Sequence, residues 1–181
     1  MIRKVRFFSI ADFEEEELWL REQHRRGLRF VKCVPPCFYV FEACQPEDVV
    51  YRLDYKNAAL GADYLQLFGD YGWEYIQTMF GWCYFRKSAS LAQRENDAEI
   101  FSDPASKVDM IRHLFQTRML PLLAIFLCCI LPNWARLVLD QAGRTEQILG
   151  MAFTGLLLLY VYLLLYCAIK LRTLRKKYTR S

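Results

Sequence analysis

The sequence predicts an α+β domain with an antiparallel or mixed sheet over residues 1–90, followed by a two-helix transmembrane hairpin. Three observations support this prediction. Charge is concentrated in residues 1–118, whereas residues 119–171 are almost entirely apolar. In the charged part, short β-rich segments alternate with two helical segments, and their order repeats once. A chain of 181 residues has room for one such domain and an appendage.

The first half of the domain reads as strand, helix, strand, strand. The strands are expected at residues 4–10, 28–34 and 37–43. Asp12 is expected to cap the helix, with Glu15 completing a capping-box spacing, and Gly27 is expected to end it.

The second half repeats this order, with strands at 48–55, 73–79 and 82–87 and a helix at 59–70 that ends before Gly72. An offset of 45 residues aligns Val5 with Val50, Leu20 with Leu65, Gly27 with Gly72, Val31 with Ile76 and Tyr39 with Tyr84. We therefore expect an internal duplication. Since each half has one helix for three strands, both helices are expected to cover one face of a sheet.

Several predicted strands are aromatic or apolar on both faces, whereas a sheet covered on one side should alternate more cleanly. A partner protein, a second copy in a homodimer or the membrane surface could cover the second face. The alternative is that aromatic residues favour strands and lie half exposed. The residues expected to contact a partner are Tyr39, Trp73, Tyr75, Trp82 and Tyr84.

No catalytic, cofactor-binding or metal-binding constellation is recognisable, so we expect no enzyme activity, no cofactor and no metal. Cys33 and Cys37 are spaced CxxxC, and no second ligand cluster follows them. The run Glu14 to Glu17 is expected to serve the helix dipole and solvent, and His24 is expected at the surface. The net charge of +4 comes from the C-terminal tail, so direct nucleic-acid binding is not expected.

The uncharged runs 119–135 and 148–169 predict membrane spans at residues 119–138 and 148–169. About 20 apolar residues are needed to cross a bilayer core of about 30 Å. Residues 91–103 are expected to form a linker. Residues 104–118 are expected to form a juxtamembrane amphipathic helix, which either lies at the interface or runs straight into the first span.

Basic residues near the ends of the spans predict the orientation. Nine lie before the first span or after the second, against two, Arg136 and Arg144, in the connecting stretch 136–147, which includes the extracytoplasmic loop 139–147. Both termini are therefore expected in the cytoplasm of a two-span cell-membrane protein. The tail 170–181 is expected to contact anionic lipid through Lys170, Arg172, Arg175, Lys176 and Lys177.

The sequence resembles the DUF2812 family of bacterial proteins of unassigned function. The resemblance lies in FEEEELWLREQHRRG at 13–27, FYVFEA at 38–43, VVYRLDY at 49–55, LFGDYGWEY at 67–75, GWCYFRK at 81–87 and EIFSDPASKVDMIRHLF at 99–115. Leu28 stands where family members often have tryptophan. Genes of this family often neighbour PadR-like transcriptional regulators, so the resemblance implies a regulatory or sensing role.

The leading functional hypothesis is a non-enzymatic, membrane-anchored regulatory module that binds a protein partner, for which a PadR-like regulator is one candidate. The first alternative is a membrane-linked sensor of a small molecule or peptide bound between sheet and helices. The second is an immunity or envelope-stress protein that acts through its spans.

Overall fold

The structure is a computed structural model that describes residues 1–56, 61–91, 104–139 and 144–179, without the side chains of 104–106, 137–139 and 144–149. The chain divides into two compact units, Met1–Asp103 and Pro104–Ser181. Except for Leu91, the predicted linker 91–103 lies outside the described residues, as do residues 140–143 of the predicted loop.

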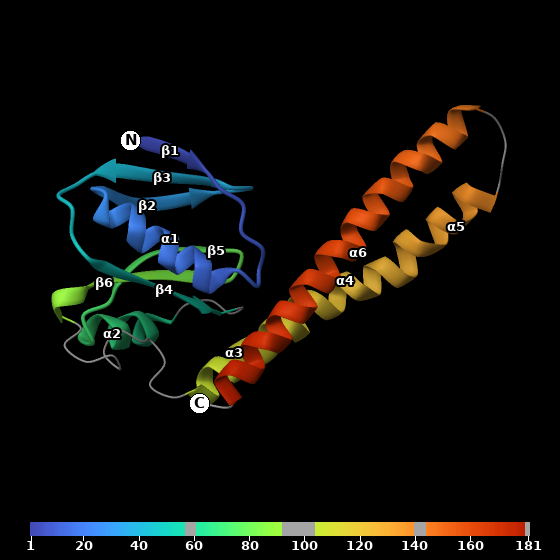
Figure 1. The fold of residues 1–181 in the computed structure, drawn as a ribbon. Coiled ribbons are helices and arrows are strands. Elements are labelled where there is room, and N and C mark those ends of the chain that lie inside the picture. Colours follow the sequence, from blue (N-terminus) through green and yellow to red (C-terminus); the bar gives the residue numbers. More distant parts are fainter. Residues whose placement is uncertain (57–60, 92–103, 140–143, 180–181) are drawn as a thin grey trace. The chain divides into compact units, whose positions relative to one another are not determined.

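The first unit contains two β-α-β-β repeats (Figure 1). The first repeat comprises β1 (Ile2–Val5), α1 (Phe13–Arg25), β2 (Leu28–Val34) and β3 (Phe38–Ala43). The second comprises β4 (Val49–Tyr55), α2 (Ala62–Asp70), β5 (Glu74–Met79) and β6 (Trp82–Ser88), followed by the 3-10 turn Ala89–Leu91. The antiparallel strand order is β1-β3-β2 in the first sheet, sheet A, and β4-β6-β5 in the second, sheet B. The α+β class and the element order are confirmed, although the first strand lies earlier than predicted.

Fine details of the two repeats also agree, which supports the duplication. The β2–β3 register shifts between Phe30 and Lys32, and the β5–β6 register shifts between Tyr75 and Gln77, 45 positions later. Gly27 and Gly72 follow their helices with φ of 78° and 77°, a left-handed conformation that glycine adopts without a Cβ penalty.

The offset of 45 is wrong for the edge strands β1 and β4 and for the central strands β3 and β6. Phe38 pairs with Val34 across the first hairpin, and Trp82 pairs with Met79 across the second. The second hairpin loop is thus one residue shorter, and Phe38 corresponds to Trp82 at an offset of 44. On the other side of Phe38 and Trp82 lie Val5 and Tyr55, respectively, so Val5 corresponds to Tyr55 and not to Val50.

The expectation that both helices cover one face of a single sheet is wrong, because the strands form two sheets. Figure 1 shows α1 between sheet A and sheet B, and α2 on the far side of sheet B. The ring of Trp19 in α1 lies against Tyr39 and Phe41 of sheet A, while Phe13 stacks on Trp82 of sheet B.

The face of sheet B that points away from α1 is covered by α2, which explains why strands of this sheet are aromatic or apolar on both faces. Val50, Trp73, Cys83 and Phe85 form a buried cluster there, and Tyr64, Leu65 and Phe68 of α2 pack against it. Each large apolar side chain buried in this way contributes roughly 1.5–3 kcal/mol to folding. Sheet B is therefore covered on both faces by elements of its own chain.

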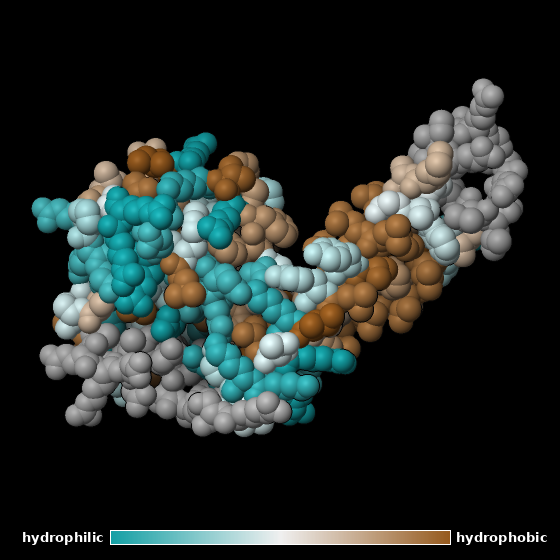
Figure 2. All heavy atoms as spheres, in the orientation of Figure 1, coloured by the Kyte–Doolittle hydropathy of each residue, from teal (hydrophilic) through white to brown (hydrophobic). Residues whose placement is uncertain are grey.

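The second unit is a helical hairpin. Its first arm runs through α3 (Pro104–Leu114), η3 (Phe115–Met119), α4 (Leu120–Ile125), η4 (Phe126–Ile130) and α5 (Leu131–Leu139). Its second arm is α6 (Arg144–Thr179). Segments Lys107–Arg136 and Gly150–Thr179 are long and apolar enough to cross a membrane, and Figure 2 shows hydrophobic side chains over the middle of this unit.

The first arm contains two π-helical segments, each ending two residues before a proline. Met119 ends η3 before Pro121, and Ile130 ends η4 before Pro132. Proline has no N–H, and its ring crowds the carbonyl four residues earlier, so a wider turn relieves the clash. The helix therefore continues through both prolines without a break.

Hydrogen bonds between described residues join the arms. The indole Nε1 of Trp134 donates to Thr154 Oγ1 at 2.9 Å, and the hydroxyl of Tyr160 donates to the carbonyl of Leu122 at 2.7 Å. The ring of Tyr160 also stacks on Phe126. A mid-span tyrosine thus has its hydroxyl satisfied inside the hairpin.

Helix α3 continues through η3 into α4, as in the second of the two expected arrangements. Its apolar residues Met110, Ile111 and Leu114 are buried, as are Cys167, Leu171 and Leu174 of α6. The predicted basic tail is not a separate segment, because α6 continues as a helix to Thr179. A helix of 36 residues is about 54 Å long, which exceeds the hydrocarbon core of about 30 Å.

Candidate functional site

The candidate site is the face of sheet A that points away from α1, which we call the open face. It consists of Arg3, Val5, Lys32, Val34, Phe38, Val40 and Glu42. Within it, Val5, Phe38 and Val34 are direct neighbours across all three strands. They are 68%, 41% and 42% exposed, so a continuous apolar row meets solvent.

Basic side chains flank the apolar row. Arg3 and Lys32 stand on either side of Val40, two residues along the strands from the row of Phe38, and both are exposed. Glu42 is paired with Arg29 at the far end of the face. The open face therefore combines apolar surface with positive charge, which suits an apolar partner that carries acidic groups.

The residues expected to contact a partner lie elsewhere. Tyr39, Trp73, Trp82 and Tyr84 are buried, because α1 and α2 cover the faces of the sheets on which they lie. Tyr75 is 36% exposed, and its hydroxyl bonds to Thr78. Four of the five predicted residues thus belong to the core and cannot meet a partner in this conformation.

Glu16 of α1 joins the two sheets. Its Oε1 accepts hydrogen bonds from Tyr39 of sheet A at 2.8 Å and from Tyr84 of sheet B at 2.7 Å. Burial raises the pKa of this carboxyl above its usual range, and the two tyrosine hydrogen bonds offset only part of that rise. The arrangement holds α1 in place between the sheets.

Glu17 closes the free edge of sheet B. Its Oε1 accepts the backbone N–H of Leu53 in the edge strand β4 at 2.8 Å, and its Oε2 is 3.2 Å from Arg52 Nη1. An edge strand with unpaired N–H groups can pair with another chain, so this contact protects β4 from unwanted strand addition.

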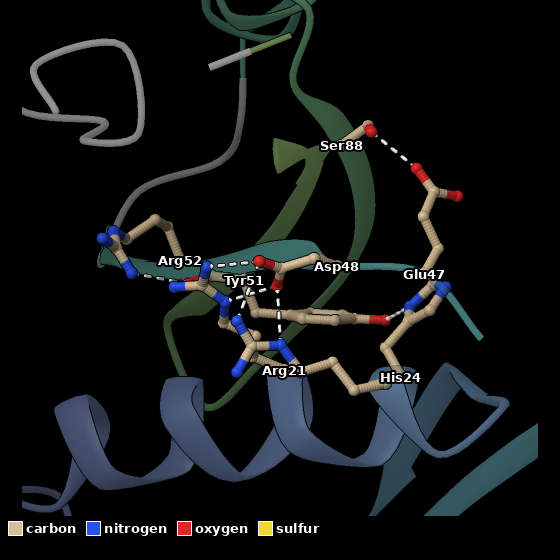
Figure 3. Close-up of polar contacts among 8 residues, drawn as sticks. Arg21, His24, Glu47, Asp48, Tyr51, Arg52 and Ser88 are labelled. Carbon is tan, nitrogen blue, oxygen red and sulfur yellow. Dashed lines mark hydrogen bonds and ion pairs between the residues drawn. The ribbon is translucent and has the colours of Figure 1, made fainter. Parts of the chain in front are cut away.

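The C-terminal half of α1 is fixed to the start of β4 by a second polar cluster (Figure 3). Asp48 accepts bidentate hydrogen bonds from both Arg21 and Arg25, which holds the pKa of this carboxyl well below its usual range. His24 Nδ1 lies 2.7 Å from the hydroxyl of Tyr51, and both side chains are buried. Burial, followed by the charge of Arg86, lowers the pKa of His24.

These contacts correct two expectations from the sequence. Glu16 and Glu17 do not serve only the dipole and solvent, and His24 is not a surface residue, because all three are buried. The helical spacing of the sequence indicates this burial, because positions 16, 17 and 24 lie on the same face of α1 as Phe13 and Leu20, which are buried. Asp12 accepts the N–H of Ser9 and makes no capping bond to the helix.

The residues predicted to contact lipid all lie on the last turns of α6. Lys170 follows the apolar run directly and lies over the ring of Tyr166, and Lys177 lies over Tyr178. Seven residues of helix separate Lys170 from Lys177, a rise of about 10 Å. Lys170 and Arg172 therefore stand nearest to the apolar run, while Arg175, Lys176 and Lys177 lie further along the helix.

Among the residues that the structure describes, no group of three or more His, Cys, Asp or Glu side chains is placed to hold a metal ion. Cys33 is buried, and burial raises the pKa of its thiol to about 12. Such a thiol stays protonated at neutral pH and is a poor nucleophile.

Comparison with known proteins gives one match. Residues 12–125 match the model of a family described as a protein of unknown function, DUF2812. No curated protein and no solved structure matches the chain. The match extends from α1 into the first arm of the hairpin, so it includes both β-α-β-β repeats except β1.

Proposed function

Because the chain belongs to the DUF2812 family, whose description assigns no function, we propose a function from its geometry: a membrane-anchored, non-enzymatic module that binds a protein partner on its open face. The observation that carries this proposal is the exposed row of Val5, Phe38 and Val34. An apolar row that spans a whole sheet and is flanked by basic residues is typical of a protein-binding surface.

The hairpin provides the anchor. Two apolar helices with nine basic residues at one end and two at the other are expected to place both termini in the cytoplasm of a cell-membrane protein. Neither uncharged run carries an ionisable group that would mark a transport pathway. The folded unit Met1–Asp103 would then meet cytoplasmic proteins. A PadR-like transcriptional regulator is one candidate partner, because genes of the DUF2812 family often neighbour such regulators.

Site-specific photo-crosslinking in living cells tests the proposal. A benzoylphenylalanine is placed at Phe38, or at Leu18 as the control. Leu18 lies on α1 and is 63% exposed, so it matches Phe38 in apolar character and accessibility. The expected result is a light-dependent, protease-sensitive adduct of discrete mass at Phe38 and none at Leu18.

Three results would contradict the proposal. The first is the lack of any adduct at Phe38, and the second is the same adduct at both positions. The third is an adduct at Phe38 that contains only lipid or only a second copy of the chain. A lipid adduct would make the open face a membrane-contacting surface, and a self-adduct would make it a homodimer interface.

A further inference from the structure

The second repeat shows what occupies the face that is open in the first. In sheet B the face equivalent to the open face carries Tyr55, Trp82 and Met79 in the positions of Val5, Phe38 and Val34. That face is closed in part by α1, whose Phe13 ring stacks on Trp82 with ring centroids 5.3 Å apart. The two repeats therefore offer the same row, one occupied by an aromatic anchor from a helix and one exposed.

We propose that the open face binds an amphipathic helix of the partner, in which an aromatic anchor is followed three and four residues later by acidic residues. This inference rests on the proposed function and names the structural class of its partner. The anchor packs on Val5, Phe38 and Val34 as Phe13 packs on Trp82. The acidic residues then lie over the neighbouring positions along the strands.

Charge supports the acidic part of this pattern. Glu16 and Glu17 stand three and four residues after Phe13 in α1, and they meet Tyr84, Arg52 and the N–H of Leu53 on sheet B. The position of Leu53 in sheet B is taken by Arg3 in sheet A, and that of Gln77 by Lys32. Both side chains are exposed, so the open face has basic groups where sheet B receives the carboxylates of its helix.

The helix is not supplied by a second copy of this chain. The repeat equivalent of α1 is α2, which at an offset of 45 begins with Ala62 in the place of Glu17 and has Gly61 as its N-cap in the place of Glu16. This helix lacks the acidic pair. We therefore take the partner to be a different protein.

The test uses purified full-length protein in lipid nanodiscs and a fluorescent, end-blocked peptide of residues 11–26, which carries the pattern of α1. We expect anisotropy to show saturable binding. Phe38→Glu in the protein, or Phe13→Ala in the peptide, should weaken binding by roughly tenfold or more, as loss of a central anchor does. Leu18→Glu in the protein is the matched control and should leave binding unchanged.

A charge exchange sharpens the test. Lys32→Glu in the protein should weaken binding of the natural peptide, and a peptide with Glu16→Lys and Glu17→Lys should bind this variant more tightly than it binds the wild type. Binding that survives Phe38→Glu would mean that the peptide replaces α1 in its own position, which overturns the inference. A lack of peptide binding overturns it as well, while a protein adduct at Phe38 in the crosslinking experiment would leave the proposed function standing.

Discussion

Phe38 and Trp82 occupy the same position in the two repeats, yet Trp82 is buried beneath Phe13 while Phe38 is 41% exposed. The equivalent strands β3 and β6 are both central in their sheets, but β6 presents its aromatic ring to the core and β3 presents its ring to solvent. A large apolar side chain at an exposed position contributes little to folding. An exposed row of such side chains is typical of a binding surface.

This difference predicts unequal effects on stability. Trp82→Ala should lower the free energy of unfolding by about 3–5 kcal/mol, because it leaves a cavity in the core. Phe38→Ser should change it by about 1 kcal/mol or less, because water already reaches the ring. Thermal or denaturant unfolding of the first unit within the full-length protein in detergent measures both. Equal losses would show that Phe38 is a core residue and would remove the basis of the proposed docking surface.

Substitution of the two glycines that end α1 and α2 should also destabilise the protein to different extents. Gly27→Ala and Gly72→Ala both place a Cβ on a left-handed residue, at a cost of about 1–2 kcal/mol. The new Cβ at Gly27 would also lie 3.0 Å from the carbonyl oxygen of Cys44, whereas at Gly72 the nearest atom is Lys87 Cε at 3.7 Å. Gly27→Ala should therefore be the more destabilising of the two in the same unfolding assay. The reverse order would contradict the geometry of the β2–β3 strand ends.

Glu16 predicts a pH dependence with a defined sign. Burial raises the pKa of its carboxyl in the folded protein, so the folded state binds this proton more tightly than the unfolded state. The contribution of Glu16 to stability is therefore lost as pH rises from its ordinary pKa through the raised value. Glu16→Gln stays neutral, so the stability of the variant relative to the wild type should increase with pH across this range.

The measurement is the free energy of unfolding of both proteins between acidic and neutral pH. Other acids, such as Asp48 with its lowered pKa, titrate in both proteins and cancel in the difference. A difference that stays constant with pH would mean that the pKa of Glu16 is the same in the folded and the unfolded protein, which would contradict the raised pKa.

The hairpin predicts a pair of tyrosine variants with different outcomes. Tyr160→Phe removes the hydrogen bond to the Leu122 carbonyl and should weaken the hairpin by about 0.6 kcal/mol, the average for such contacts between membrane helices. Tyr162→Phe is the control, since its side chain is 63% exposed. Thermal stability of the full-length protein in mild detergent should fall for the first and not for the second. Equal behaviour would contradict the packing of the two arms.

Sequence reasoning recovered the element order because helix-ending glycines and β-rich runs are local signals. The predicted bounds of β2, 28–34, agree with the structure, and the predicted ends of α1 and α2 lie within a few residues of the observed ends. It did not recover the splitting of the strands into two sheets. That depends on which strand pairs with which, and sequence periodicity does not record pairing between distant strands.

The aromatic residues were misassigned for a related reason. Trp82 and Tyr84 alternate with Cys83 and Phe85 in β6, and all four are buried because α1 covers one face and α2 the other. A strand covered on both faces and a strand with one binding face have the same composition. The open face was missed because Val5 and Phe38 become neighbours only through the β1–β3 pairing. The buried Glu16 was missed because a run of four glutamates is most often a solvated face.

Carbene footprinting tests, without any substitution, whether a protein covers the open face in the cell. Labelling of Phe38 and Val34 is compared between native membranes and purified protein reconstituted in the same lipids, with Leu18 as the internal reference. If a protein covers the open face, labelling of Phe38 and Val34 should fall severalfold in native membranes while labelling of Leu18 stays unchanged. Equal labelling of Phe38 in the two preparations would contradict the proposed function.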